Sequence, residues 1–289
     1  MGLRALVVGG TSGIGYGMAC RLAADTLSPS VIISGRTKPT TMPHSNMEFR
    51  PLDASSMRQI KQYTDTFKSA AEPKLDFLVM TQGIMTTAGR TETPDGIDRK
   101  MALHYYGKQL LIRELLPVLK NDAKVVIVLD GKTGDPSKLD WEDLDLKKHY
   151  SLAKAANHCI VMNDVMVQYH AAQQQKLHGN DAGRRHFVHA YPGGVETGLF
   201  RELPWYLQPL MKLAFKIVAV TPDVCAERLL SGVARCAAAS GENNEGIFWS
   251  NIDNRGRSIG NKTIFSEEQM TKVANHTWHL VDEAIGKSP

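Results

Sequence analysis

Short apolar runs rich in β-branched residues alternate along this chain with longer amphipathic segments. The runs cover residues 3–8, 31–34, 77–80, 124–129, 186–190 and 246–249, and another short one precedes Leu52. The first amphipathic segment spans residues 16–27. This alternation predicts an α/β fold: a single Rossmann-type, doubly wound parallel sheet with helices on both faces. No repeat or Pro/Ser-rich linker interrupts it, so we expect one domain over 1–289, with an insert near 131–149 and a substrate-side lid near 196–222.

A glycine-rich turn separates the first apolar run from the first helical segment. The first glycine permits a tight turn, and the later ones let the backbone approach a pyrophosphate and let the helix pack closely on the strand. The free N–H groups and the positive end of the helix dipole then face the phosphates. We therefore predict a dinucleotide cradle. Its residues are Gly9, Thr11, Ser12, Gly13, Ile14 and Gly15.

The residues after the second apolar run indicate which nicotinamide cofactor the cradle holds. An NAD enzyme places an acid near this point to bind the ribose 2′-hydroxyl. Here no acid occurs between Asp25 and Glu48, whereas Arg36 and Lys38 follow the strand directly. Both cations can pair with a 2′-phosphate dianion. The sequence therefore favours NADPH/NADP+.

The chain resembles the short-chain dehydrogenase/reductase family in two motifs that follow one another in the family's order. They are Gly-x-x-x-Gly-x-Gly at 9–15 and Tyr150-Ser-Leu-Ala-Lys154. One helical turn separates Tyr150 from Lys154, which predicts phenol and ammonium on one helix face. The resemblance, which runs from residue 3 to about 200, implies that Lys154 holds the nicotinamide ribose and lowers the pKa of Tyr150. The phenol could then exchange a proton with a carbonyl oxygen near neutral pH.

The resemblance also assigns cofactor contacts outside the cradle. Gly83 would approach the adenosine ribose through its backbone. Asp53 would accept a hydrogen bond from the adenine amine, with a simple loop cap as the alternative role. The loop after the sixth apolar run resembles the family's Pro-Gly loop at the nicotinamide. Its cofactor-binding residues would be Pro192, Gly193, Val195 and Thr197.

Three departures from the family pattern fall close to the expected reaction centre. Thr81-Gln82-Gly83 stands where the family commonly reads Asn-Asn-Ala-Gly, so the hydrogen bonds that brace this strand must be replaced. His104 takes the place of an Asn that positions a relay water, and histidine titrates near pH 6.5; an ordinary packed histidine is the alternative. Asp130 takes the place of the catalytic Ser.

Asp130 is the departure with the largest chemical consequence. Ionised, it would repel a developing alkoxide, whereas a protonated Asp130 could donate the missing hydrogen bond. Thr133 or Ser137 could supply a hydroxyl instead, because the gap from 130 to 150 exceeds the usual separation. The segment 132–149 resembles the inserts of carbonyl reductases and retinol-type dehydrogenases.

Composition narrows the class of protein further. The net charge of +4 comes from scattered cations rather than a block, so nucleic-acid binding is not indicated. The four cysteines lack metal-ligand spacing, and we predict buried free thiols, a cytoplasmic location and no metal. The apolar run starts too early to leave room for a signal peptide. No apolar stretch reaches membrane-spanning length, and residues 205–220 predict an amphipathic helix that covers a substrate pocket or contacts a membrane surface.

These observations predict an NADPH-dependent oxidoreductase that acts on a carbonyl of an apolar small molecule, or on the matching alcohol. Tyr150 and Lys154 would be catalytic, with Asp130 and His104 as modified parts of the relay. The overall resemblance suits atypical fungal members found beside secondary-metabolite pathways. Two alternatives stay open: an NADPH-binding protein without redox turnover, and a non-redox dehydratase or cyclase that uses Asp130, His104 and Tyr150. Relatives suggest a homodimer through the helices near 100–118 and 151–170, unless the insert blocks it.

Overall fold

A seven-stranded parallel sheet forms the centre of the molecule, in the order β3-β2-β1-β4-β5-β6-β7. The computed structural model describes residues 2–25, 29–70, 72–178, 184–198, 202–206, 208–209, 219–242 and 247–286. The strands are β1 Arg4–Val8, β2 Ser30–Gly35, β3 Met47–Pro51, β4 Leu75–Met80, β5 Leu119–Val128, β6 His186–Ala190 and β7 Trp249–Ile252.

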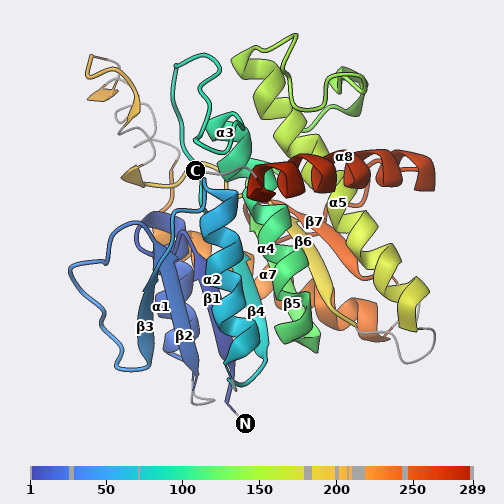
Figure 1. Ribbon diagram of the computed structural model, residues 1–289. Coiled ribbons are helices and arrows are strands. Elements are labelled where there is room, and N and C mark those ends of the chain that lie inside the picture. The colour runs from blue at the N-terminus through green and yellow to red at the C-terminus, as the bar shows by residue number, and fades with distance from the viewer. Residues whose placement is uncertain are drawn as a thin grey trace.

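Helices cover both faces of the sheet (Figure 1). The longer ones are α1 Gly13–Ala23, α2 Met57–Ser69, α4 Gly107–Leu115, α5 Leu152–His178, α7 Pro222–Glu242 and α8 Glu267–Gly286. The short α3, Arg99–Met101, leads through a π-helix, Ala102–Tyr106, into α4. Single 3₁₀ turns occupy Leu116–Val118 and Pro136–Lys138. The predicted doubly wound α/β fold is confirmed.

The strands feed two separate hydrophobic layers because successive side chains point to opposite faces of a sheet. In β1, Leu6 and Val8 face the layer of α2, α4, α5 and α8, whereas Ala5 and Val7 face α1 and α7. Every residue of β1 is buried, as expected for a parallel strand that helices cover on both sides. This rigid support fixes the carboxyl end of β1, where the glycine turn begins.

The C-terminal helix α8 lies across the near face of the molecule and packs against α5 and α2 (Figure 1). Hydrogen bonds join the Tyr105 hydroxyl to Thr277 Oγ1 (2.6 Å) and the Tyr106 hydroxyl to His276 Nε2 (2.9 Å). The chain itself therefore covers part of the face through which the homodimer was predicted. The insert also packs on this face, because Asp135 and Asp140 hydrogen-bond to Asn157 and His158 of α5, and the homodimer stays a prediction.

Some boundaries differ from those that the hydrophobic pattern predicted. The last strand is β7, Trp249–Ile252, so the predicted run 246–249 was placed too early. The reason is that β7 carries buried polar residues, Ser250 and Asn251, which hydrogen-bond to His186 and Asp164. All four cysteines are free, but only Cys159 and Cys225 are buried. Within the described residues, none of the helices has the length and apolarity to cross a membrane.

Candidate active site

A pocket opens at the carboxyl ends of the strands, where the chain order reverses between β1 and β4. Ligands of open α/β sheets bind at such a switch point. The glycine turn, the ends of β2 and β4, the segment after β3 and part of α3 contribute its lining, together with Thr197, Gly198 and Glu202. The predicted cradle residues Gly9, Thr11, Ser12, Gly13, Ile14 and Gly15 all line it. The structure therefore brings the sequence-predicted cradle together in one place.

Two glycines of the cradle adopt backbone conformations that other residues rarely enter. Gly9 has φ +80° and Gly13 has φ +55°. A Cβ at Gly9 would lie 2.6 Å from the Gln82 nitrogen, and one at Gly15 would overlap the Gly9 carbonyl oxygen and Thr81 Oγ1. The missing side chains therefore let the turn pack directly on the Thr81–Gln82 segment and let α1 begin close to Gly9. A pyrophosphate at the N-terminus of α1 fits this cradle.

The residues expected to select the cofactor lie at one end of this pocket. Arg36 is exposed on the pocket wall, and among the described residues no carboxylate pairs with it. Asp53 also lines the pocket, but its Oδ1 accepts hydrogen bonds from the nitrogen (3.0 Å) and hydroxyl (2.7 Å) of Ser55. Asp53 therefore serves as a loop cap through Oδ1, and its contact with an adenine stays a prediction. Arg36 is thus an exposed cation on the pocket wall, and its pairing with a 2′-phosphate stays a prediction.

The segment after β4 is braced by threonine rather than by the amides of the family pattern. Thr81 Oγ1 lies 3.2 Å from the carbonyl oxygens of both Val8 and Gly9, to which it donates. The Thr81 hydroxyl therefore replaces the hydrogen bonds that amide side chains form here in the family pattern. Gly83 lines the pocket as expected, and a Cβ there would lie 2.9 Å from His104 Nε2.

His104 belongs to the π-helix, an element that often marks functional sites. Its Nε2 accepts a hydrogen bond from the Ile84 nitrogen at 3.0 Å, and its carbonyl oxygen accepts one from Asn163 Nδ2. Burial, together with the charge of Lys108, lowers the pKa of His104 to about 3. The expectation that His104 titrates near pH 6.5 is therefore wrong. It stays neutral and fixes the Ile84–Gly83 backbone at the pocket.

Tyr150 and Lys154 do not form the predicted pair on one helix face. The helix α5 begins at Leu152, so Tyr150 precedes it. Among the described residues, none forms a hydrogen bond with the buried Tyr150 hydroxyl, and Lys100 Nζ lies 5.4 Å from the ring centroid. Burial raises the pKa of Tyr150, and Lys100 partly opposes that shift.

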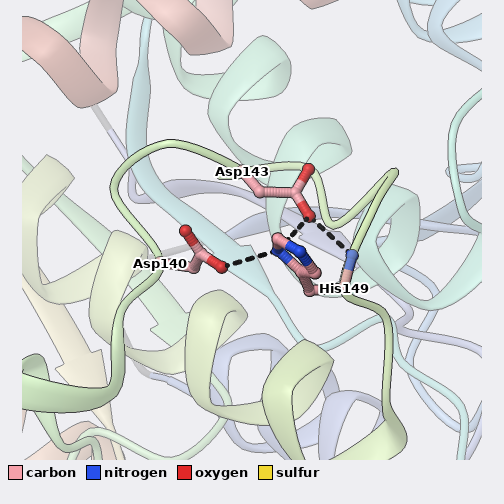
Figure 2. A group of neighbouring side chains, drawn as sticks. All are labelled: Asp140, Asp143 and His149. Atoms are coloured by element: carbon pink, nitrogen blue, oxygen red, sulfur yellow. Dashed lines mark hydrogen bonds and ion pairs between the residues drawn. The ribbon is translucent and has the colours of Figure 1, made fainter.

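An acidic turn of the insert accounts for the position of Lys154. Figure 2 shows Asp140 and Asp143 on either side of His149, and Asp140 Oδ2 also lies 3.9 Å from Lys154 Nζ. Ligand atoms of the three residues lie within 4.8 Å of one another, close enough for a metal ion. However, Asp143 Oδ2 already accepts the backbone N–H groups of Lys148 and His149. The three side chains therefore connect the two ends of the segment 140–149, and Asp140 also forms an ion pair with Lys154.

Asp130 follows β5 as predicted but is engaged in its own turn. Its Oδ1 accepts the nitrogens of Lys132 and Thr133, each at 3.0 Å, and its Oδ2 accepts the Thr133 hydroxyl at 2.5 Å. All three bonds use the carboxylate as acceptor, so none of them requires an acid proton. The structure therefore does not favour the protonated Asp130 that the sequence suggested, and Thr133 is not a free hydroxyl.

The loop after β6 contributes one of its expected residues to the pocket. Thr197 lines it, whereas Pro192, Gly193 and Val195 do not. Val195 is buried and forms a parallel bridge with Val220, and Gly193, with φ +71°, packs against Asn254. Most of the predicted 205–220 helix lies outside the described residues.

Sequence reasoning missed an ion pair at the pocket mouth. Arg99 Nη1 and Nη2 donate to the two carboxylate oxygens of Glu202 at 3.0 and 2.9 Å, and both residues line the pocket. The partners are 103 residues apart, so no local pattern could have paired them. The ion pair joins α3 to Glu202 of the chain that follows β6.

Comparisons with known proteins identify the family and the fold of this chain. The profile of the short chain dehydrogenase family matches residues 4–162. An oxidoreductase from Emericella nidulans is 33% identical over 68% of this chain, and the match spans only 60% of that protein's own length. The polyprenol dehydrogenase of Homo sapiens is 30% identical over 76% of this chain and 68% of its own. The NADPH-bound carbonyl reductase from chicken fatty liver shares the fold, with TM-score 0.57, 17% identity, and coverage of 89% of this chain and 94% of that chain.

Proposed function

We propose that this chain, which belongs to the short-chain dehydrogenase family, uses NADPH to reduce a ketone or aldehyde of an apolar small molecule, or NADP+ to oxidise the matching alcohol. The main support for this proposal is that the glycine cradle and Arg36 line the same pocket. The cradle suits a pyrophosphate, and Arg36 adds a cation where an NAD-binding protein would carry an acid.

When bound, the nicotinamide supplies or accepts the hydride. Tyr150 would transfer the proton to or from the substrate oxygen. A buried phenol with a raised pKa keeps its proton at neutral pH, which is the state needed to protonate an alkoxide. Lys100 would stabilise the phenolate left behind, because its ammonium lies over the Tyr150 ring. Lys154 would contribute to ribose binding once it leaves Asp140.

Pocket chemistry and relatives both support an apolar substrate. Ile84, Met85 and Leu103 line the pocket beside Gly83. By their names, one similar protein is a polyprenol dehydrogenase and another is an NADPH-bound carbonyl reductase. Their substrates are thus long-chain alcohols and carbonyl compounds.

One observation favours a second function, NADPH binding without redox turnover. Neither Tyr150 nor Asp130 lines the cofactor pocket, and Asp130 is occupied by its turn. The deciding experiment follows the NADPH absorbance in both directions. For reduction, the protein is incubated with NADPH and a panel of apolar ketones and aldehydes. For oxidation, it is incubated with NADP+ and a panel of polyprenols. Turnover that disappears in Tyr150→Phe supports the oxidoreductase. Stoichiometric binding with no turnover across the panel supports the second function.

A further inference from the structure

A short turn beside the pocket mouth presents two large aromatic side chains to solvent. Trp205 is 82% exposed and Tyr206 is 62% exposed, and their rings meet edge to face with centroids 6.1 Å apart. Single exposed apolar residues are common on protein surfaces, but Trp and Tyr carry the largest areas that a protein can bury. Two of them side by side in solvent therefore indicate a surface that is covered by a partner.

The turn is anchored at its base, so the exposure of the aromatic pair follows from the local structure. Glu202 is fixed by its two hydrogen bonds to Arg99, and the next residue, Leu203, is buried. Gln208 Nε2 donates to the Leu203 carbonyl oxygen at 2.9 Å, and the Gln208 backbone nitrogen donates to that of Pro204 at 3.3 Å. The described part of this segment, light orange between grey traces in Figure 1, projects from the side of the molecule where the strands end.

The chemistry of the segment fits a lipid surface. Trp and Tyr combine an apolar ring with a polar N–H or O–H group, and such side chains gather where lipid hydrocarbon meets the headgroups. Lys212 and Lys216, which lie outside the described residues, are the only charged residues in the sequence from 203 to 222. An apolar segment with lysines one helical turn apart is typical of helices that lie on a membrane.

Charge also separates a lipid surface from a second copy of the chain as the partner. A symmetric contact between two copies of this segment would bring lysines together with no acid to pair with them. Anionic lipid headgroups, in contrast, offer the opposite charge.

We infer that the Trp205–Tyr206 turn docks the protein on an anionic lipid surface, with the pocket mouth beside the headgroups. Glu202 and Arg99 line the pocket and also anchor the turn, so the docked turn holds the mouth close to the lipid. An apolar substrate dissolved in the lipid would then enter the pocket without crossing water. This last consequence rests on the proposed function, whereas the lipid contact itself does not.

Vesicle flotation tests the contact directly. The variant Trp205→Ser/Tyr206→Ser is compared with Ile264→Ser, which removes an apolar side chain that is 73% exposed in the segment that hydrogen-bonds to α5. The vesicles contain phosphatidylcholine alone or with about one-quarter phosphatidylserine. We expect the wild type to bind the mixed vesicles at least about tenfold more tightly than phosphatidylcholine alone. The double variant should bind the mixed vesicles at least about tenfold more weakly than the wild type, and the control variant should match the wild type.

NADPH affinity and the thermal midpoint should stay unchanged in both variants, because neither aromatic residue lines the pocket and all three substituted side chains are exposed. A wild type that does not float, that floats equally without phosphatidylserine, or that floats no better than the double variant would overturn the inference. Loss of a dimer in the double variant, seen by sedimentation without vesicle binding, would assign the aromatic pair to a contact between two copies instead. A wild type that floats but binds no NADPH would overturn the proposed function and support the lipid contact.

Discussion

Adding one methyl group at Gly9 should dismantle the cofactor cradle. Gly9 has φ +80°, a conformation that costs an alanine about 1–2 kcal/mol. The new Cβ would also lie 2.6 Å from the Gln82 nitrogen and 2.6 Å from Thr81 Oγ1, so backbone must move to admit it. Overfilling of this kind costs about 1–3 kcal/mol. Together these effects predict that Gly9→Ala lowers the free energy of unfolding by about 2–5 kcal/mol.

Urea unfolding and NADPH calorimetry on the same protein measure both consequences. We expect NADPH affinity to fall by at least a hundredfold, since the turn that faces the pyrophosphate is displaced. Gly89→Ala is the matched control, because a Cβ there meets nothing within 4 Å and Gly89 does not line the pocket. A folded Gly9→Ala protein whose NADPH affinity lies within threefold of wild type would refute the assignment of this turn as the cofactor site.

Three further predictions concern the reaction centre and pH. Tyr150→Phe should reduce turnover by about a hundredfold or more while NADPH affinity stays nearly constant; a full rate in steady-state assays would place the proton donor elsewhere. Asp130→Ser should lower the free energy of unfolding by about 1 kcal/mol, since serine cannot accept all three bonds of the turn; a changed pH profile of turnover at unchanged stability would instead show that Asp130 reacts. Burial lowers the pKa of His170 to about 3 and of His186 to about 4. Both lie below the unfolded value, so the unfolded chain binds protons first as the pH falls. As the pH falls from about 6 to 4, each histidine should lower the free energy of unfolding by about 1.4 kcal/mol per pH unit. Urea midpoints that do not change from pH 7 to 5 would contradict this.

The sequence was sufficient for the sheet and for the cradle because both depend on local signals. The run 186–190 became β6 with the same bounds, and the glycine turn formed where its spacing predicted. In contrast, β7 contains Ser250 and Asn251, whose burial depends on partners in distant elements. A hydrophobic pattern cannot place such a strand.

The reaction centre was harder to predict because long-range contacts decide it. The spacing of Tyr150 and Lys154 indicates one helical turn only if the helix already includes Tyr150, and α5 begins two residues later. Asp140 of the insert then attracts Lys154, while Lys100 approaches Tyr150 from α3. Neither of these pairings has a local sequence signature.

Calorimetry of NADPH and NADH against the wild type and Arg36→Ala tests the central claim most directly. A charge-assisted contact to the 2′-phosphate of about 1.5–3 kcal/mol predicts that the wild type prefers NADPH by roughly ten- to a hundredfold. That preference should disappear in Arg36→Ala, with NADH affinity unchanged. Equal affinity of the wild type for both cofactors, or a preference that survives in Arg36→Ala, would contradict the account.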